Sequence, residues 1–248
     1  MSTGVTITPA WPSAHAKTAQ KGKRLIMVAI DKGGVGKSFF CLRLIEWLEQ
    51  RKIPFRAFDP DFSNSTLTRF YPEAQFLDIR HSENLDGIMF SFEHNDLVLV
   101  DGVGAQQKIF LDWLADTDLL HAQEPLGLAI TLALIIEEDK DTVFQAGEAV
   151  RRVGDRVDWL VVKNQKLSAR NLIYEKSDAR QELLRCGAHE ITMPKLTDPL
   201  SLSLQLKSLT ITEAMTRNSF PLLDRQRLLN YSRQLWRQLD AIQDILIP

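Results

Sequence analysis

Apolar residues along this chain gather in short runs, and the stretches between the runs repeat with the spacing of amphipathic helices. Runs of nearly continuous apolar character are typical of strands that are buried on both faces of a parallel sheet. These runs occupy residues 25–30, 55–58, 97–100, 128–136 and 159–162. Helical spacing occurs at residues 39–50, 107–115, 140–153 and 174–185. This alternation predicts an α/β fold with a doubly wound, mostly parallel sheet and helices on both faces.

The last third of the chain has a more helical pattern. Across residues 222–247 apolar side chains recur close to every 3.6 residues, which predicts a helix packed against the core. Residues 24–248 are therefore expected to form a single domain. Residues 1–23 lack the apolar core of a secretory signal and are expected to be a disordered tail. Basic residues near the end of this tail offer an alternative, a weak contact with DNA or an acidic partner. They are Lys17, Lys21, Lys23 and Arg24.

The composition of the 248 residues fits one domain of an ordinary soluble protein, with a formal net charge of -2 and 25% charged residues. This balance does not indicate general nucleic-acid binding, although it leaves room for a local basic patch. Cys41 and Cys186 lie far apart and outside any C-x-x-C, which fits free thiols in a reducing cytosol. The longest apolar run, residues 126–136, is too short to span a bilayer. A cytoplasmic location without an integral membrane segment is expected.

The most informative segment follows the first apolar run and reads DKGGVGKS at positions 31–38. A strand, a glycine-rich turn and then a helix form the context of a phosphate-binding loop, in which backbone N–H groups converge on phosphate oxygens. Lys37 would reach the β- and γ-phosphates, and the Ser38 hydroxyl would ligate Mg²⁺. The common pattern G-x-x-x-x-G-K-[ST] fails because Asp31 takes its first glycine position. The pattern K-G-G-x-G-K-[ST] holds, with an additional lysine at Lys32.

Two acidic residues follow predicted strands and suit the chemistry of a nucleotide bound with Mg²⁺. Asp101 ends an apolar run and would lie beside Ser38, where it would hold the ion directly or through water. Asp61 follows another run and is a candidate to orient or deprotonate an attacking water and to contact the ion. The alternative for this loop is a helix cap formed by Asp61 or Ser63.

An asparagine at the end of a further predicted strand bears on the choice of base. The side-chain amide of Asn164 can both donate to and accept from an adenine edge. Guanine-specific loops read N-K-x-D, whereas the four residues from Asn164 read NQKL and lack the acid. The sequence therefore favours ATP over GTP.

Taken together, residues 24–195 resemble the MinD/ParA family of deviant Walker A ATPases, of the ParA-like type found in plasmid partition and transfer. The motifs that carry this resemblance are KGGVGKS at 32–38, DPD at 59–61, DG at 101–102 and VVKN at 161–164. In addition, ITMP at 191–194 looks like the short strand and proline that border the base pocket in that family. The first motif is highly specific, and the others support it.

The resemblance implies an ATPase that forms a homodimer when it binds ATP with Mg²⁺ and dissociates after hydrolysis. In the family the signature lysine, here Lys32, reaches across the dimer to the partner's nucleotide and acts like an arginine finger. Asp61 matches the family's water-positioning aspartate. The implied setting is the positioning or segregation of DNA or of a protein assembly. The implied partners are a protein activator or adaptor and non-specific DNA.

The candidate site residues fall into three groups. The catalytic candidates are Lys32 and Asp61, and the metal-binding candidates are Ser38, Asp61 and Asp101. The candidates for binding ATP are Gly33, Gly34, Val35, Gly36, Lys37, Ser38, Phe39, Asn164 and Pro194.

The chain also departs from the family pattern. Asp31 places an anion near the phosphates, which would weaken nucleotide affinity unless it faces Lys32 or solvent. FSNS at 62–65 and GVGAQ at 102–106 differ from the P-Q-G-N and T-P-A of relatives, which indicates a different partner. Two alternative functions remain open. One is a small-molecule ATP-dependent ligase or kinase on the same scaffold, and the other is a nucleotide-binding adaptor that does not hydrolyse ATP.

Overall fold

A parallel sheet forms the centre of the protein. The computed structural model describes residues 22–61, 65–79, 82–102, 107–217 and 220–248, and within them the sheet has seven strands. Their order is β3-β2-β4-β1-β5-β6-β7, and every neighbouring pair is parallel. The strands are β1 (Lys23–Val28), β2 (Arg56–Asp59), β3 (Gln75–Phe76), β4 (Leu97–Val100), β5 (Leu128–Ile136), β6 (Asp158–Asn164) and β7 (His189–Met193).

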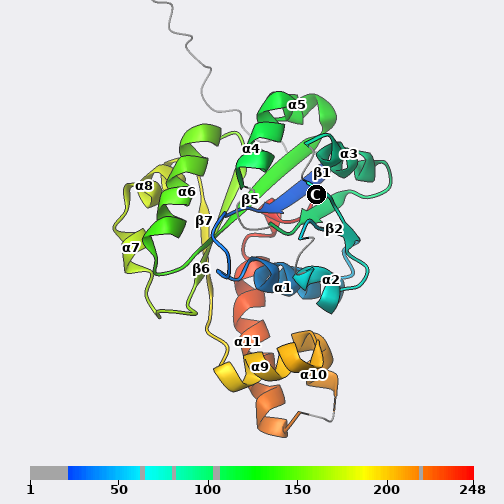
Figure 1. The fold of residues 1–248 in the computed structure, drawn as a ribbon, viewed down its shortest axis with the longest axis vertical. Coiled ribbons are helices and arrows are strands. Elements are labelled where there is room, and N and C mark those ends of the chain that lie inside the picture. Colours follow the sequence, from blue (N-terminus) through cyan, green and yellow to red (C-terminus); the bar gives the residue numbers. More distant parts are fainter. Residues whose placement is uncertain (1–21, 62–64, 80–81, 103–106, 218–219) are drawn as a thin grey trace, which may run out of the picture.

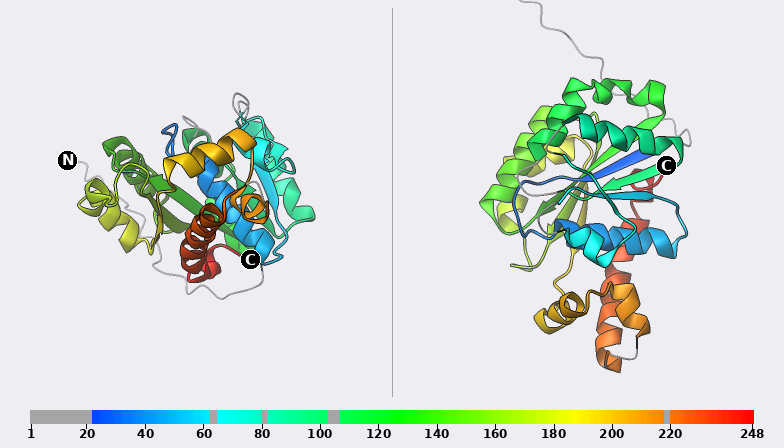
Figure 2. Two further views of the ribbon diagram at one scale, coloured as in Figure 1. Left: turned by 90° about the horizontal axis from the view of Figure 1, so that it is seen from below. Right: turned by 45° about the vertical axis from the view of Figure 1, so that its right-hand side comes forward.

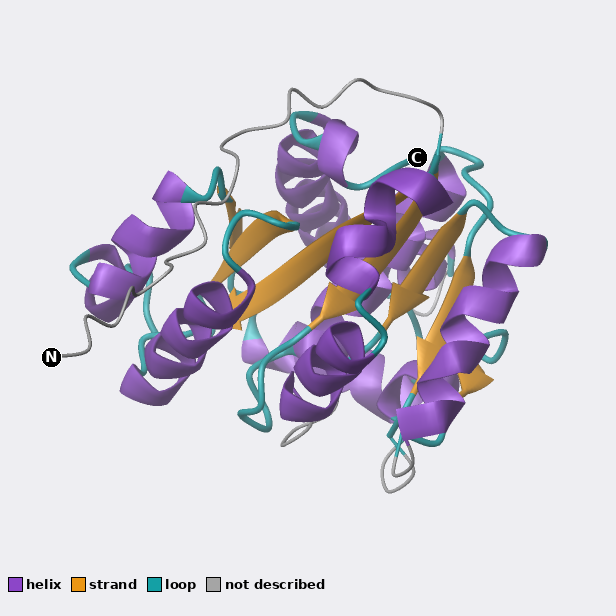
Figure 3. Cartoon of the chain, turned by 90° about the horizontal axis from the view of Figure 1, so that it is seen from above, coloured by secondary structure: helices purple, strands orange, loops and turns teal. Residues whose placement is uncertain are grey.

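Helices cover both faces of this sheet, as right-handed crossovers between parallel strands require (Figure 1, Figure 3). One face carries α1 (Lys37–Gln50), α2 (Thr66–Phe70) and α11 (Leu222–Asp240). The other carries α3 (Asp86–Phe90), α4 (Gln107–Asp116), α5 (Leu119–Leu126), α6 (Lys140–Val153), α7 (Leu172–Glu175) and α8 (Asp178–Arg185). The central strands are almost wholly buried between these layers. The predicted doubly wound α/β fold is confirmed.

Beyond β7 the chain builds a helical lobe that projects away from the sheet (Figure 1, Figure 2). The lobe consists of α9 (Asp198–Lys207), α10 (Ile211–Thr216) and the first turns of α11. Thr210 and Glu213 form a reciprocal capping box that starts α10. The described residues also contain the short 3-10 helices η1 (Ser82–Leu85), η2 (Ser91–Glu93) and η3 (Gln243–Ile245). No helix in this described part is both long and apolar enough to cross a bilayer.

The apolar runs located five strands to within two residues of their ends: β1, β2, β4, β5 and β6. Two predicted helices differ from the structure. The helix expected at 174–185 is divided into α7 and α8, because Ser177 accepts a hydrogen bond from the backbone N–H of Arg180 and caps a new helix. The helix expected at 222–247 ends at Asp240, and the residues that follow turn back toward the sheet.

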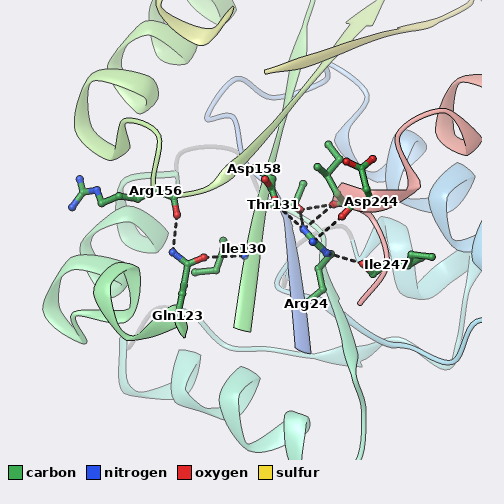
Figure 4. Close-up of polar contacts among 9 residues, drawn as sticks. Arg24, Gln123, Ile130, Thr131, Arg156, Asp158, Asp244 and Ile247 are labelled. Atoms are coloured by element: carbon green, nitrogen blue, oxygen red, sulfur yellow. Dashed lines mark hydrogen bonds and ion pairs between the residues drawn. The ribbon is translucent and has the colours of Figure 1, made fainter. Parts of the chain in front are cut away.

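Arg24 binds the segment that follows this turn, and its burial removes it from the basic cluster expected near the end of the tail. It is 7% exposed in β1 and forms an ion pair of 2.8 Å with Asp158 (Figure 4). Its guanidinium also donates to Thr131 and to the main-chain oxygens of Asp244, Ile245 and Ile247. Lys23 lies in β1 as well, whereas Lys17 and Lys21 fall outside the described residues. Arg24 therefore fastens the segment after α11 to the first strand.

Replacing Arg24 with methionine is expected to lower the free energy of unfolding by about 3–5 kcal/mol, because the largely buried Asp158 carboxylate and the main-chain oxygens of Asp244 and Ile247 would each lose a bond to the guanidinium. Urea unfolding followed by circular dichroism measures this change. Arg233→Met is the matched control, because Arg233 is exposed on α11, and its effect is expected to stay within about 0.5 kcal/mol. Equal losses in the two variants would contradict the assigned role.

Candidate functional site

The candidate residues meet at the carboxyl edge of the sheet. In a parallel sheet all strands end at the same edge, and ligands of α/β folds bind in the crevice outside it. The register places Val100 of β4 beside Met27 of β1 and Phe58 of β2, and Asn164 of β6 beside Met193 of β7. A cleft of about 690 Å³ opens at this edge, between the loop after β1 and helix α9.

Most of the sequence-predicted positions line this cleft. They are Gly33, Gly34, Gly36, Lys37, Ser38, Phe39, Asp61, Asn164 and Pro194. Val35 lies in the core with its side chain 1% exposed, and Asp101 is buried beneath the cleft at 2%. Other lining residues were not predicted: Thr66, Gly102, Lys166, Lys195, Leu196, Asp198, Ser201 and Gln205. Those after residue 194 come from α9 and the segment before it, and no local motif marks them.

The backbone after β1 has the shape of a phosphate cradle. Gly34 and Gly36 have φ values of 76° and 93°, a region that side chains with a Cβ rarely adopt. Helix α1 begins directly at Lys37, so its unpaired N–H groups face the loop. At Gly102 a Cβ would come within 1.7 Å of the Val28 carbonyl oxygen. Only glycine therefore fits where the chain after β4 crosses the end of β1.

The ammonium group of Lys37 lies inside this cradle and donates a 2.7 Å hydrogen bond to the main-chain oxygen of Lys32. Burial lowers the pKa of Lys37, and the carboxylates of Asp101, Asp31 and Asp61 act in the opposite direction. A buried cation beside three acids and a glycine-rich turn can hold the charged oxygens of a polyphosphate.

Asp101 is the buried acid of the site. Burial raises its pKa to about 7, while a hydrogen bond from Ser38 and the charge of Lys37 act in the opposite direction. Its Oδ1 is buried without a hydrogen-bond partner in the described structure. A desolvated carboxylate oxygen beside a serine hydroxyl is a donor set that suits Mg²⁺. The residues therefore fit a nucleotide-bound magnesium ion.

Asp61 lines the cleft, and the loop that carries it is fixed by Asp59. One carboxylate oxygen of Asp59 accepts from the backbone N–H of Asp61 at 3.0 Å. The other accepts from the N–H and the hydroxyl of Thr68, both at 2.9 Å. Helix α2 starts after Ser65, so Asp61 is not its N-cap residue. Ser63 lies outside the described residues, as do most of the two divergent segments at 62–65 and 102–106.

The amide of Asn164 is already engaged with the loop. Its Nδ2 donates to the Val35 oxygen at 2.9 Å, and its Oδ1 accepts from the Lys166 backbone at 3.0 Å. Lys166 in turn donates from its Nζ to the Gly34 oxygen at 3.0 Å. Asn164 thus ties β6 to the phosphate loop. One N–H and one lone pair of the amide are left over, so a contact with an adenine edge stays a prediction.

Lys32 points out of the cleft and toward the start of α6. Its ammonium contacts Asp139 at 2.6 Å and Asp141 at 3.2 Å, and its side chain is 30% exposed. Hydrogen bonding to Asp139 raises the pKa of Lys32, so the group stays cationic. Asp139 is also the N-cap residue of α6. Neither aspartate was predicted as a site residue, although the acidic run directly after β5 was a usable signal.

Comparisons with known proteins agree with this geometry. No protein-family model matches the chain. The chain is 20% identical to Protein MobD of Acidithiobacillus ferrooxidans over 226 aligned residues. The alignment covers 89% of this chain and 98% of that protein.

Solved structures give the fold. The MinD cell division protein of Aquifex aeolicus matches with a TM-score of 0.53 and 13% identity over 86% of this chain and 96% of that one. The MinC:MinD complex of the same organism matches with a TM-score of 0.50 and 14% identity over 86% of this chain and 95% of that one. A third match is the septum site-determining protein MinD of Pyrococcus horikoshii OT3, which was solved in complex with Mg-ADP. Its TM-score is 0.54, and its identity is 13% over 90% of this chain and 98% of that one.

The chain therefore has the α/β fold of the MinD-like P-loop proteins, with a parallel sheet and a C-terminal helix. The resemblance to MinD/ParA-like proteins that its motifs indicated is confirmed.

Proposed function

We propose that this protein is an ATP-dependent dimerisation switch, which binds ATP with Mg²⁺ in the cleft and hydrolyses it to ADP and phosphate. The observation that carries the proposal is that the two lysines of one loop place their ammonium groups on different sides of the cleft wall. Lys37 lies inside the cleft among three carboxylates, whereas Lys32 extends to the rim and carries its charge outside. A cation placed at the rim suits a second nucleotide better than its own.

Binding is assigned to the cradle. The backbone N–H groups of the loop and the start of α1 hold the phosphates, with Lys37 as their counter-charge. Ser38 and Asp101 hold Mg²⁺, which neutralises charge on the phosphate oxygens when it is bound. The base is assigned to the part of the cleft between Asn164 and Pro194.

Hydrolysis is assigned to Asp61 and Lys32. Asp61 orients a water for in-line attack, from a loop that Asp59 fixes through the backbone. Lys32 of one protomer reaches the nucleotide of its partner and stabilises charge on the transferring phosphoryl group. Each site is then complete only in the dimer, which couples turnover to assembly.

The proposed role is the positioning or segregation of DNA or a protein assembly in the cytoplasm, with a protein activator or adaptor as partner. MinD of Aquifex aeolicus has been solved in a complex with MinC, which supports a protein partner for this fold. Basic side chains on the exposed face of α11, Arg233 and Arg237 among them, give non-specific DNA a surface to contact.

Molar mass measured by light scattering with ADP, ATP and a non-hydrolysable ATP analogue tests the proposal, with and without DNA. We expect monomers with ADP, a stable dimer with the analogue, and a dimer with ATP that decays as phosphate appears. Monomers in every condition would contradict the switch. A dimer without single-turnover hydrolysis would identify an adaptor, and turnover that depends on a small acceptor would identify a ligase or kinase.

A further inference from the structure

Asp31 replaces the first glycine of the common phosphate-loop pattern. Its carboxylate does not pair with Lys32 but contacts the start of helix α4. Its Oδ1 accepts a 2.5 Å hydrogen bond from the backbone N–H of Gln107, the first residue of α4. The first N–H groups of a helix have no partner within the helix, and a carboxylate is their most favourable acceptor. The phosphate loop therefore supplies an anionic cap to a helix that starts 76 residues later.

Gln107 also closes a ring of polar contacts around this bond. Its side chain is 5% exposed, and its Nε2 donates to the main-chain oxygen of Gln145 in α6 at 3.2 Å. The side-chain oxygen of Gln145 accepts from the backbone N–H of Lys32 at 3.1 Å. Asp31 and Lys32 are consecutive, so the loop, α4 and α6 are joined at one point.

Gly102, which follows β4 and Asp101, lies against the end of β1. Gly102 packs so closely on the Val28 carbonyl that a Cβ would clash at 1.7 Å. Asp101 precedes it and is the candidate ligand of Mg²⁺. Gly102 and Gln107 are thus each held by a residue that ends or follows β1: Gly102 by Val28 and Gln107 by Asp31.

We propose that Asp31 is a positioning residue of the nucleotide site, which fixes the start of α4 to the phosphate loop and thereby supports turnover. The inference rests on the proposed ATPase function. A glycine at this position has no side chain to make the bond, so the departure from the common pattern has a structural use. Its cost is a negative charge close to Lys37 and to the bound phosphates.

Two substitutions separate the bond from the charge. Asp31→Asn keeps an oxygen that accepts from Gln107 and removes the charge, whereas Asp31→Gly removes both and restores the common loop pattern. Without nucleotide, hydrogen exchange in the first turn of α4 is expected to rise about tenfold or more in Asp31→Gly. It should change little in Asp31→Asn and in the control Asp112→Asn, which alters an acid further along α4.

The kinetic arm distinguishes affinity from turnover. Both Asp31 variants are expected to bind ATP about three- to tenfold more tightly, because both lose the repelling charge. Only Asp31→Gly should also lose turnover, by about tenfold, because α4 is then misplaced relative to the site. Asp31→Asn should keep kcat close to that of the original protein.

Several results would overturn the proposal. Unchanged exchange in apo Asp31→Gly would show that the bond does not hold α4. Equal losses of kcat in the two Asp31 variants would assign the effect to charge instead of position. If the unaltered protein hydrolyses no ATP, the proposed function fails, while the exchange measurement without nucleotide still decides whether Asp31 anchors α4.

Discussion

Replacing Lys37 with alanine is expected to raise the Kd for ATP with Mg²⁺ by about 100-fold or more, since each charge-assisted hydrogen bond to phosphate contributes about 1.5–3 kcal/mol. The acidic side chains around Lys37 are expected to increase this loss of affinity. Lys37 is the cation placed among the carboxylates of Asp31, Asp61 and Asp101. Without it an incoming polyphosphate would approach Asp61 in the cleft, and the nearby Asp31 and Asp101, without the compensating charge of Lys37. Calorimetric titration with a non-hydrolysable ATP analogue measures the change.

Lys195→Ala is the matched control for this measurement. Lys195 also lines the cleft, but its side chain is half exposed and is paired with Asp198 at 3.2 Å. Removing an exposed, already paired charge is expected to change the Kd by no more than about threefold. Equal effects of the two substitutions would mean that the phosphates do not lie in the cradle.

Replacing Lys32 with alanine is expected to leave ATP binding within a small factor of the original and to reduce turnover by about 1,000-fold, as removal of a trans-acting cation does. The reason is the position of its ammonium, which lies on Asp139 and Asp141 outside its own cleft. ATP-dependent dimerisation should be lost together with turnover. Phosphate release and light scattering on the same samples measure both. Unchanged dimerisation would refute the trans role.

A second test of the trans role uses Asp139 and Asp141, the two aspartates that contact Lys32. To reach a partner's nucleotide, the lysine must leave both of them. The double variant Asp139→Asn/Asp141→Asn removes their charges and keeps an asparagine at the N-cap of α6, where it caps as well as aspartate does. We expect it to dimerise with ATP at lower protein concentration. Lys140→Ala, an exposed neighbour, is the control and should behave like the original protein.

Much of the fold was accessible from the sequence because its strands are buried on both faces. A strand such as β5 has no solvent side, so it appears as an unbroken apolar run. The short β3 was missed because its two residues are exposed and carry no pattern. The turn after Asp240 was missed for another reason. Ile242 and Ile245 continue the helical spacing of α11, yet that segment bonds to Arg24 instead of extending the helix.

The candidate site divides in the same way. Asp101 was found because it directly follows β4, and Lys37 and Ser38 were found because they begin the helix after the glycine-rich loop that follows β1. The partners of Lys32 and Asp31 lie more than 70 positions away along the chain, and only the folded chain brings them together. Chemistry could be predicted where it follows a strand end, and the contacts that position it could not.

The hydrogen bonds of Arg24 also set an order for the completion of folding. The main-chain oxygens that it binds belong to residues 220 to 223 positions further along the chain. At a synthesis rate of roughly 5–20 residues per second, they emerge roughly 11–45 s after Arg24. Until then Asp158 and Thr131 can bind the guanidinium, but its other N–H groups would be buried without acceptors, at a cost of about 1–3 kcal/mol each. On the ribosome, we therefore expect the side chain of Arg24 to stay partly hydrated until residues 244–247 arrive.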